Sequence, residues 1–366
     1  MFIFISCEDN SFEKIPAPRD FVSIKDNSFS VNNNKYYPLT LNYIAELRYD
    51  NNQFWISSCK DYSNKKSRVY IEKDSSILEF KSHMQLIKDM GFNSIRFVRA
   101  GAVKINPKTK QIFIKARTKS VKDTTLILSD SSNNYRLYLS AIEESLKIID
   151  SVGLKVVYLT NLSPDYKELD SHFIKVAKKF KNNSTIMAYD LTNEPLYFDK
   201  KERTKREVFE CVNDWQRMFR KYAPYHLSTI GLEGIREVFE WDPNILNVDF
   251  ISYHPYEHEK EQVRNEIYWY SKYTDKPWII GETGWYTSAL NESDSLTSQK
   301  TFVNKTLQQA FSCNASGFSW WQFKDVSWKD LKNHSDLMGL VTKDGIVQSS
   351  KSNFPIVGTV KNSVEV

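Results

Sequence analysis

Two glutamates, each placed at the end of a short apolar run, are the residues of this sequence best suited to acid–base chemistry. Glu194 follows the apolar run 186–191, and Glu282 follows the run 277–281. Such a run, bounded by turn-forming residues, is typical of a buried parallel strand, and α/β enzymes place their chemistry where these strands end. Paired carboxylates can cut a glycosidic bond, one by donating a proton and the other by attacking the anomeric carbon.

The two carboxylates need a scaffold that brings distant strand ends to one rim, and the alternation of patterns along the chain predicts such a scaffold. Strands are predicted at 39–43, 94–98, 155–159, 186–191, 226–230, 248–253, 278–282 and 317–321. Helices are predicted at 76–90, 135–152, 166–180, 204–222, 258–273 and 296–312, with a short last helix within 354–366. This alternation favours a closed (β/α)8 TIM barrel. An open doubly wound sheet is disfavoured because no glycine-rich phosphate-binding fingerprint follows an early strand.

A short hairpin and a long excursion complete the predicted domain. Residues 21–37 alternate between apolar and polar types around two Asn-containing turns, which predicts an N-terminal β-hairpin at the barrel floor. Residues 99–134 are rich in Lys and Thr and show no helical period, and an excursion of this length is usually functional or disordered. We expect it to shape one end of a cleft. The prediction is a single catalytic domain, 21–366, preceded by a leader or tether, 1–20.

The first seven residues of the sequence indicate where in the cell the protein is expected to be. Residues 1–7 resemble the end of a bacterial lipoprotein signal, in which Cys7 would be lipidated, although the apolar stretch is short and the basic n-region is missing. This favours an exported protein with a lipid anchor at Cys7, on a cell envelope or outer surface; a chance resemblance is the alternative. The other cysteines, Cys59, Cys211 and Cys313, show no C-x-x-C spacing, so neither a zinc site nor a disulfide framework is indicated.

The amino-acid composition limits the classes of molecule that the protein is expected to bind. The 50 basic and 45 acidic residues are interleaved along the 366-residue chain, giving a net charge of +5 without the concentrated basic face that a phosphate backbone needs. Nucleic acid is therefore not expected as a partner. Aromatic residues make up 14% of the chain, and their rings either lie against the apolar faces of sugars or fill a bulky core.

Five motifs in barrel order resemble those of clan A glycoside hydrolases, most of all the family 5 cellulase and mannanase group. They are GFNSIR at 91–96, TNEP at 192–195, YHPY at 253–256, GETG at 281–284 and GFSWW at 317–321. The resemblance covers about residues 37–321. It implies a retaining β-glycoside hydrolase, an O-glycosyl hydrolase that cleaves an oligo- or polysaccharide through a two-glutamate double displacement. It implies a carbohydrate substrate and neither a metal nor an organic cofactor.

The resemblance also implies roles for the residues around the pair. Glu194 matches the acid/base and Glu282 the nucleophile. Arg96 is the partner expected for Glu282, because an unpaired charge inside an apolar strand would be costly. Asn193 matches the position that hydrogen-bonds the sugar 2-hydroxyl, with a turn-forming Asn as the alternative.

Aromatic and imidazole side chains are expected nearby. His254 and Tyr256 lie two residues apart, so an extended segment points both the same way. The resemblance implies that Tyr256 holds the nucleophile and that His254 lines the pocket. Trp321 or Trp320 would form the platform beneath the cleaved sugar, and only one can face inward; we favour Trp321. Trp285 either adds a sugar contact or packs within its own loop.

One position departs from the family pattern. Asn161 stands where family 5 members usually carry a His at the end of the third strand, and Asn can bond a hydroxyl but cannot carry charge. This departure bears on the substrate more than on the reaction. Two other functions stay open: a catalytically decayed barrel that binds glycans as a surface lipoprotein, and a transglycosylase that uses the same site. The intact pair of glutamates favours an enzyme.

Overall fold

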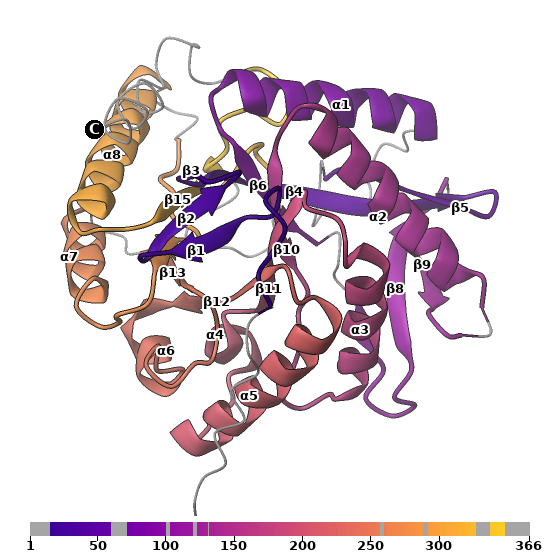
Figure 1. The fold of residues 1–366 in the computed structure, drawn as a ribbon. Coiled ribbons are helices and arrows are strands. Elements are labelled where there is room, and N and C mark those ends of the chain that lie inside the picture. Colours follow the sequence, from indigo (N-terminus) through magenta and orange to yellow (C-terminus); the bar gives the residue numbers. More distant parts are fainter. Residues whose placement is uncertain are drawn as a thin grey trace, which may run out of the picture.

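Eight parallel strands pair in chain order and close into a barrel (Figure 1). The strands are β4 (Leu39–Asp50), β6 (Ser94–Val98), β10 (Lys155–Leu159), β11 (Ile186–Asn193), β12 (Leu227–Glu233), β13 (Ile251–His254), β14 (Trp278–Ile280) and β15 (Gly317–Trp320). The barrel closes where β15 pairs with β4, with Phe318 opposite Leu39. The computed structural model describes residues 15–59, 72–99, 103–119, 123–130, 132–256, 260–287, 292–326 and 337–347. The predicted (β/α)8 TIM barrel is confirmed.

Helices surround the barrel and cover its strands (Figure 1). They are α1 (Lys73–Asp89), α2 (Asn134–Ser151), α3 (Glu168–Phe180), α4 (Pro195–Asp199), α5 (Lys205–Tyr222), α6 (Gly234–Glu240), α7 (Lys260–Tyr270) and α8 (Glu292–Ser312). In α5 the buried side chains recur at helical spacing, at Val208, Trp215 and Phe219, so one face packs on the barrel. The helix begins with a capping box, in which Thr204 and Glu207 each accept a hydrogen bond from the other's backbone N–H.

Alternation along the barrel strands separates an apolar outer layer from an interior that also carries polar groups. On β4 and β6, Tyr43 and Phe97 belong to the core between strands and helices, and Tyr43 packs edge-on against Phe80 of α1 at 5.4 Å. The intervening Asn42 and Arg96 point inward and contact each other at 3.1 Å. Because neighbouring residues of a strand face opposite sides, polar groups enter the barrel without interrupting the surrounding apolar core.

A three-stranded antiparallel sheet lies across the floor of the barrel (Figure 1). Its strands are β1 (Ser23–Lys25), β2 (Ser28–Val31) and β3 (Asn34–Lys35). The turn between β1 and β2 holds Asp26 and Asn27 at positive φ, the conformation that two-residue hairpins favour. Phe29 of β2 is buried among Leu227, Ile279 and other apolar side chains of the barrel interior. The predicted hairpin is confirmed, with one strand added.

An extension built on β4, antiparallel except where β4 pairs with β8, is the main feature that the sequence did not predict. Its other strands are β5 (Gln53–Ser58), β7 (Lys104–Ile105), β8 (Ile112–Arg117) and β9 (Asp123–Ile127). β4 continues beyond the barrel and returns as β5 through Asn51 and Asn52, both at positive φ. The excursion predicted at 99–134 therefore contains strands. Ile112 and Ile114 face inward at strand spacing, between Lys and Thr residues that hide the pattern.

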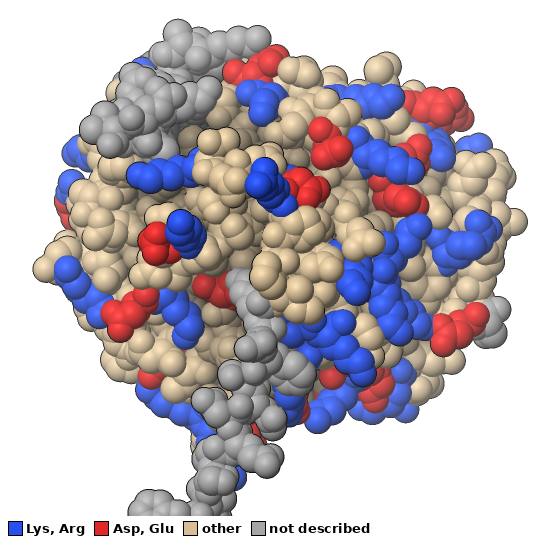
Figure 2. All heavy atoms as spheres, in the orientation of Figure 1, with Lys and Arg blue, Asp and Glu red and all other residues tan. Residues whose placement is uncertain are grey.

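Charged side chains cover the face that carries the floor sheet. Figure 2 shows acidic and basic residues interspersed over much of this face, with Lys and Arg gathered over α3. Part of this positive charge is compensated locally, since Lys179 of α3 pairs with Glu143 of α2 at 2.9 Å.

None of the helices among the described residues combines the length and apolarity needed to cross a bilayer. Cys7 with the leader as far as residue 14, and the last helix predicted within 354–366, lie outside the described residues.

The floor sheet should contribute measurably to stability. Phe29 is buried and packs edge-on against Phe250 at 5.1 Å. We expect Phe29→Ala to lower the free energy of unfolding by about 3–5 kcal/mol, the usual cost of removing a buried phenyl ring. Phe239→Ala, at a ring that is 52% exposed, should change it by less than about 1 kcal/mol. Urea titration compares the two, and equal small effects would mean that the sheet is only loosely attached.

Candidate active site

The two glutamates predicted to act as a pair face each other across the barrel mouth. Glu194 directly follows β11, and Glu282 lies just beyond the end of β14. Both carboxylates are buried. One oxygen of each lies within 4.8 Å of the other and of a ring nitrogen of His254, at the end of β13. The barrel thus gathers groups that are far apart in the sequence.

A buried arginine on β6 binds most of the acceptors around the pair. Arg96 donates from Nε to Asp190 at 2.8 Å and from Nη1 to Asn42 at 3.1 Å. It also donates to Glu282 and to the side-chain oxygen of Asn193. Burial acts to lower the pKa of Arg96, but Asp190 and Glu282 together raise it above its ordinary value. The guanidinium therefore stays charged inside the barrel.

Glu282 accepts a hydrogen bond on each of its oxygens. Arg96 donates to Oε1, the contact expected from the sequence, and the hydroxyl of Tyr256 donates to Oε2 at 2.8 Å. Burial raises the pKa of Glu282, while His254, Arg96 and Tyr256 act to lower it. Donors on both oxygens favour the ionised carboxylate, which is the form that a nucleophile needs.

Glu194 lies in contrasting surroundings. Its Oε1 is 2.7 Å from Nδ1 of His254. Burial and the negative charge of Glu233 raise the pKa of Glu194 to about 8, against the lowering effect of Arg96. Burial lowers the pKa of His254 to about 4, so its ring is neutral at pH 7 and Nδ1 donates or accepts according to its tautomer. At neutral pH Glu194 therefore holds a proton that it can transfer.

Two glycines make room for the ring of His254. A Cβ atom at Gly231 of β12 would lie 2.5 Å from Cε1 of the ring, and one at Gly281 would lie 2.8 Å from Nε2. Any side chain at these positions would displace the imidazole. With glycine there, Nδ1 of His254 reaches 2.7 Å from Glu194 and 3.8 Å from Glu282.

The end of β15 separates the two candidate tryptophans. Trp321 packs against the inward-facing apolar cluster that contains Val98 and is partly exposed. Trp320 points outward, where its ring lies 6.2 Å from that of Phe302 in α8 and its Nε1 donates to the carbonyl of Met338 at 3.0 Å. The structure thus places Trp320 outside the mouth, as alternation along the strand requires.

The remaining residues predicted to contact the sugar differ in where they lie. The ring of Trp285 stacks on Phe302 at 5.1 Å, and its carbonyl accepts from Gln299 of α8 at 2.9 Å. Trp285 therefore packs on α8 and also stacks on Tyr286 of its own loop. Asn161 lies at the rim after β10, partly buried and with a left-handed backbone at φ 52°. Asn193, at the end of β11, is held by Arg96.

Sequence reasoning missed several residues that support the site. Asn42 donates to the carbonyls of Gly281 and Trp320, both at 3.1 Å, and Asp190 pairs with Arg96. Asp190 could have been identified from the sequence, because a charged residue within an apolar strand needs a buried partner, as was argued for Arg96. Glu237 of α6 could not have been identified in this way, because a glutamate on a helix usually faces solvent.

The trio of Glu194, His254 and Glu282 has ligand atoms close enough together to hold a metal ion. However, Arg96 already provides a positive charge directly bonded to Glu282, and a divalent cation beside it would be repelled. The donor set therefore fits acid–base chemistry better than metal binding.

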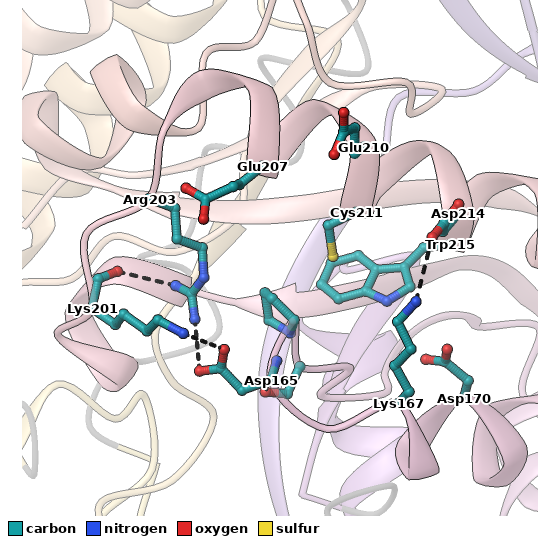
Figure 3. A pocket seen from close by; sticks show the side chains of 12 residues that line it. Asp165, Lys167, Asp170, Lys201, Arg203, Glu207, Glu210, Cys211, Asp214 and Trp215 are labelled. Atoms are coloured by element: carbon teal, nitrogen blue, oxygen red, sulfur yellow. Dashed lines mark hydrogen bonds and ion pairs between the residues drawn. The ribbon is translucent and has the colours of Figure 1, made fainter.

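A second hollow, of about 270 Å³, lies beside α5 and is lined by many charged groups (Figure 3). Lys201 and Arg203 both bind Asp165, at 2.6 and 3.1 Å. Burial raises the pKa of the Cys211 thiol to about 12, so this sulfur is a poor nucleophile. Two cations thus neutralise Asp165, one of the five carboxylates that line the hollow, and its thiol is unreactive, so we place the candidate chemistry at the pair in the mouth.

Solved structures with a similar fold include several glycoside hydrolases. The chain superposes on a β-glucuronidase from Ruminococcus gnavus with a TM-score of 0.61 and 15% identity, over 90% of this chain and 51% of that one. The exo-β-1,4-mannosidase Op5Man5 from Opitutaceae bacterium strain TAV5 gives 0.63 and 16%, over 96% and 63%. A GH5_18 protein from Streptomyces cattleya, in complex with Manβ1-4GlcNAc, gives 0.56 and 11%, over 79% and 76%.

These similarities establish the barrel fold and agree with the motif resemblance to clan A. The chain spans about half the length of the β-glucuronidase chain and 63% of the mannosidase chain. No protein-family model and no curated protein sequence matches the chain.

Removing the central cation should destabilise the protein in a pH-dependent way. We expect Arg96→Met to lower the free energy of unfolding at pH 8 by about 3–5 kcal/mol, because buried carboxylates lose their counter-ion. Without Arg96 the pKa of Glu282 rises further above its unfolded value, so protonation relieves the loss at low pH. The deficit should therefore be smaller at pH 5 than at pH 8.

Denaturant titrations at the two pH values measure this difference. Arg206→Met, at an exposed arginine paired with Glu210, serves as the control and should leave the unfolding free energy essentially unchanged at both. A variant at Arg96 as stable as the wild type at pH 8 would contradict the central role of the guanidinium.

Proposed function

We propose that the protein is a retaining β-glycoside hydrolase that cleaves an oligo- or polysaccharide, with Glu194 as acid/base and Glu282 as nucleophile. The main support is the pair of buried carboxylates with oxygens within 4.8 Å of each other. Retaining enzymes hold their two carboxyl groups about 5–5.5 Å apart, whereas inverting enzymes leave about 6.5–9.5 Å to admit a water. The observed spacing lies nearer to that of retaining enzymes and therefore favours retention.

In the proposed first step, Glu282 attacks the anomeric carbon while the bond from that carbon to the leaving oxygen breaks. Glu194 transfers its proton to the leaving oxygen, which departs as a hydroxyl, and Glu282 becomes a glycosyl ester. Arg96 and Tyr256, bonded to the two oxygens of Glu282, hold the carboxylate in the attacking orientation. This positioning lowers the barrier by reducing the orientational freedom lost during the reaction.

In the proposed second step, Glu194 acts as a base. It takes a proton from a water whose oxygen attacks the anomeric carbon, and the ester bond to Glu282 breaks. The charges of Glu194 and Glu282 repel each other. Formation of the ester removes the charge on Glu282, and this loss lowers the pKa of Glu194 when it must accept a proton.

Neighbouring groups would bind the sugar. Asn193 is oriented by Arg96 and would bond the 2-hydroxyl, a contact expected to strengthen in the transition state. Trp321 would offer a partly exposed ring as the platform for the cleaved sugar. The similar structures are described as a β-glucuronidase, a β-1,4-mannosidase and a protein bound to Manβ1-4GlcNAc, which supports a β-linked pyranoside as substrate.

Substitution of each glutamate tests the two roles. We expect Glu194→Gln to lower kcat/KM on unactivated glycosides by about 10²–10⁴-fold, the usual contribution of general acid catalysis. Glu282→Gln should abolish turnover, because no other group can form the glycosyl ester. Assays on a panel of β-glucosides, β-mannosides and β-glucuronides measure both losses.

The stereochemistry of the product provides a second readout. NMR of early products should show a retained anomeric configuration, and azide should rescue Glu194→Ala by giving a β-glycosyl azide. Near wild-type rates in both glutamine variants on every substrate that the wild type cleaves would rule out the proposal. Glycan binding without turnover of any bound glycan would favour a binding protein instead.

The acid role predicts a pH dependence. The pKa of Glu194 is raised to about 8, and the proton donor works only when protonated, so kcat/KM should fall about tenfold per pH unit above pH 8. Removing the charge of Glu233 should lower the pKa of Glu194, and Glu233→Gln should therefore move this basic limb to lower pH. A wild-type profile that stays flat to pH 9.5 would contradict the assignment.

A further inference from the structure

A buried carboxylate on α6 bonds to three backbone N–H groups at the ends of two neighbouring barrel strands. Glu237 accepts from the N–H of Leu196 at 2.6 Å and of Tyr197 at 3.2 Å, both through Oε1. Its other oxygen accepts from the N–H of Glu233, the last residue of β12. Glu237 is only 2% exposed. A single side chain thus joins the start of α4 to the end of β12.

These bonds fall on the turn that carries the proposed acid. Glu194 is the N-cap of α4, and Pro195, the first helical residue, has no N–H. Leu196 and Tyr197 therefore present the first free N–H groups of the helix, which no earlier turn can satisfy. The N-cap side chain forms no capping hydrogen bond here, because Glu194 is turned into the barrel mouth. Glu237 supplies the acceptor that an N-cap side chain usually provides.

The backbone of Glu194 adopts a disfavoured conformation that neighbouring groups must stabilise. Its dihedral angles, φ 44° and ψ 63°, are left-handed, a conformation that is unfavourable for a non-glycine residue and persists only where the surroundings enforce it. The N–H of Glu194 donates to the carbonyl of Gly231 in β12 at 2.9 Å, which fixes the backbone where the chain leaves β11. The bonds to Glu237 fix the backbone just after Glu194, at the start of α4.

We propose that Glu237 is a positioning residue for the reaction: by binding the first turn of α4 to the end of β12, it holds Glu194 in the orientation that protonates the leaving group. This inference rests on the proposed function. The hydrogen bonds of Glu237 among the described residues go to backbone N–H groups of Leu196, Tyr197 and Glu233, so it acts through the backbone of α4.

Glu237 also interacts with Glu194 through its charge. Burial and the charge of Glu194 raise the pKa of Glu237, while its three backbone hydrogen bonds act to lower it. Because both oxygens accept N–H bonds, these contacts bind the ionised form. The charged groups that face Glu194 from the surrounding elements are Arg96 of β6, Asp190 of β11, Glu233 of β12 and Glu282 after β14, with the neutral ring of His254 on β13. Removal of Glu237 therefore leaves most of the charges that act on Glu194 unchanged.

The test uses Glu237→Gln and a matched control on the same helix. In the glutamine variant the amide nitrogen has to face a backbone N–H, so at least one of the three bonds is lost. Glu240→Gln makes the same chemical change one turn later on α6, at a carboxylate that forms no hydrogen bond to α4 among the described residues. Both variants keep the side-chain volume.

Leaving-group dependence separates positioning of the acid from general damage. Aryl β-glycosides with a poor leaving group, such as phenol, need protonation by Glu194, whereas 2,4-dinitrophenyl glycosides do not. We expect Glu237→Gln to lower kcat/KM on the phenyl glycoside by about 10–100-fold, part of the full contribution of general acid catalysis, and on the dinitrophenyl glycoside by less than about threefold. Glu240→Gln should change neither.

Equal losses on both substrates, or no loss on either, would overturn the proposal. Hydrogen exchange of the backbone of 195–199 gives a readout that does not require turnover: protection should fall in Glu237→Gln and stay unchanged in Glu240→Gln. If the wild type cleaves no glycoside, the proposed function fails, yet unchanged protection in Glu237→Gln would still refute the tie to α4 separately. Should the glutamine variant not fold, Glu237→Asp, which withdraws the carboxylate by one methylene, is read in the same way.

Discussion

The placement of one positive charge inside the barrel constrains most of the site. A buried guanidinium is tolerated only when its N–H groups meet well-oriented acceptors, because each ion loses several kcal/mol of hydration. Arg96 meets them on three other elements: Asn42 on β4, Asp190 and Asn193 on β11, and Glu282 after β14. Since the planar guanidinium has a fixed geometry, it fixes the relative positions of these strand ends, and its bond to Glu282 favours the ionised form of that carboxylate.

This constraint also explains how two identical side chains acquire opposite properties. Glu282 is bonded to Arg96 and accepts donors on both oxygens, whereas Glu194 is 2.7 Å from His254 and is affected by the negative charge of Glu233. Burial affects both glutamates, so the difference comes from their partners. The imidazole beside them stays neutral, and the two glycines that make room for its ring are therefore part of the electrostatic arrangement as well as of the packing.

The sequence predicted the barrel because its elements have strong local periods, and it singled out Glu194, Glu282 and Arg96 as candidates because each breaks an apolar pattern at a strand. Alternation along β15 required only that one of Trp320 and Trp321 face inward. The extension around β8 was missed because its period of two lies among Lys and Thr residues, and β4 continues into it without a break. Contacts between different strand ends, such as Asn42 with Gly281, depend on barrel register, which no local pattern reveals.

The same reasoning accounts for the position of the proposed acid. The cation and its acceptors lie on strands, where pairing fixes the backbone, but Glu194 lies one residue past β11 in a left-handed conformation. A strand ladder cannot enforce that conformation, so the restraint has to come from side chains that reach the turn from outside. The carboxylate of Glu237 is such a group, and it belongs to the helix that follows the neighbouring strand. The barrel therefore supports its two carboxylates differently: the proposed nucleophile is held by Arg96 inside the barrel, and the proposed acid by Glu237 of α6 outside it.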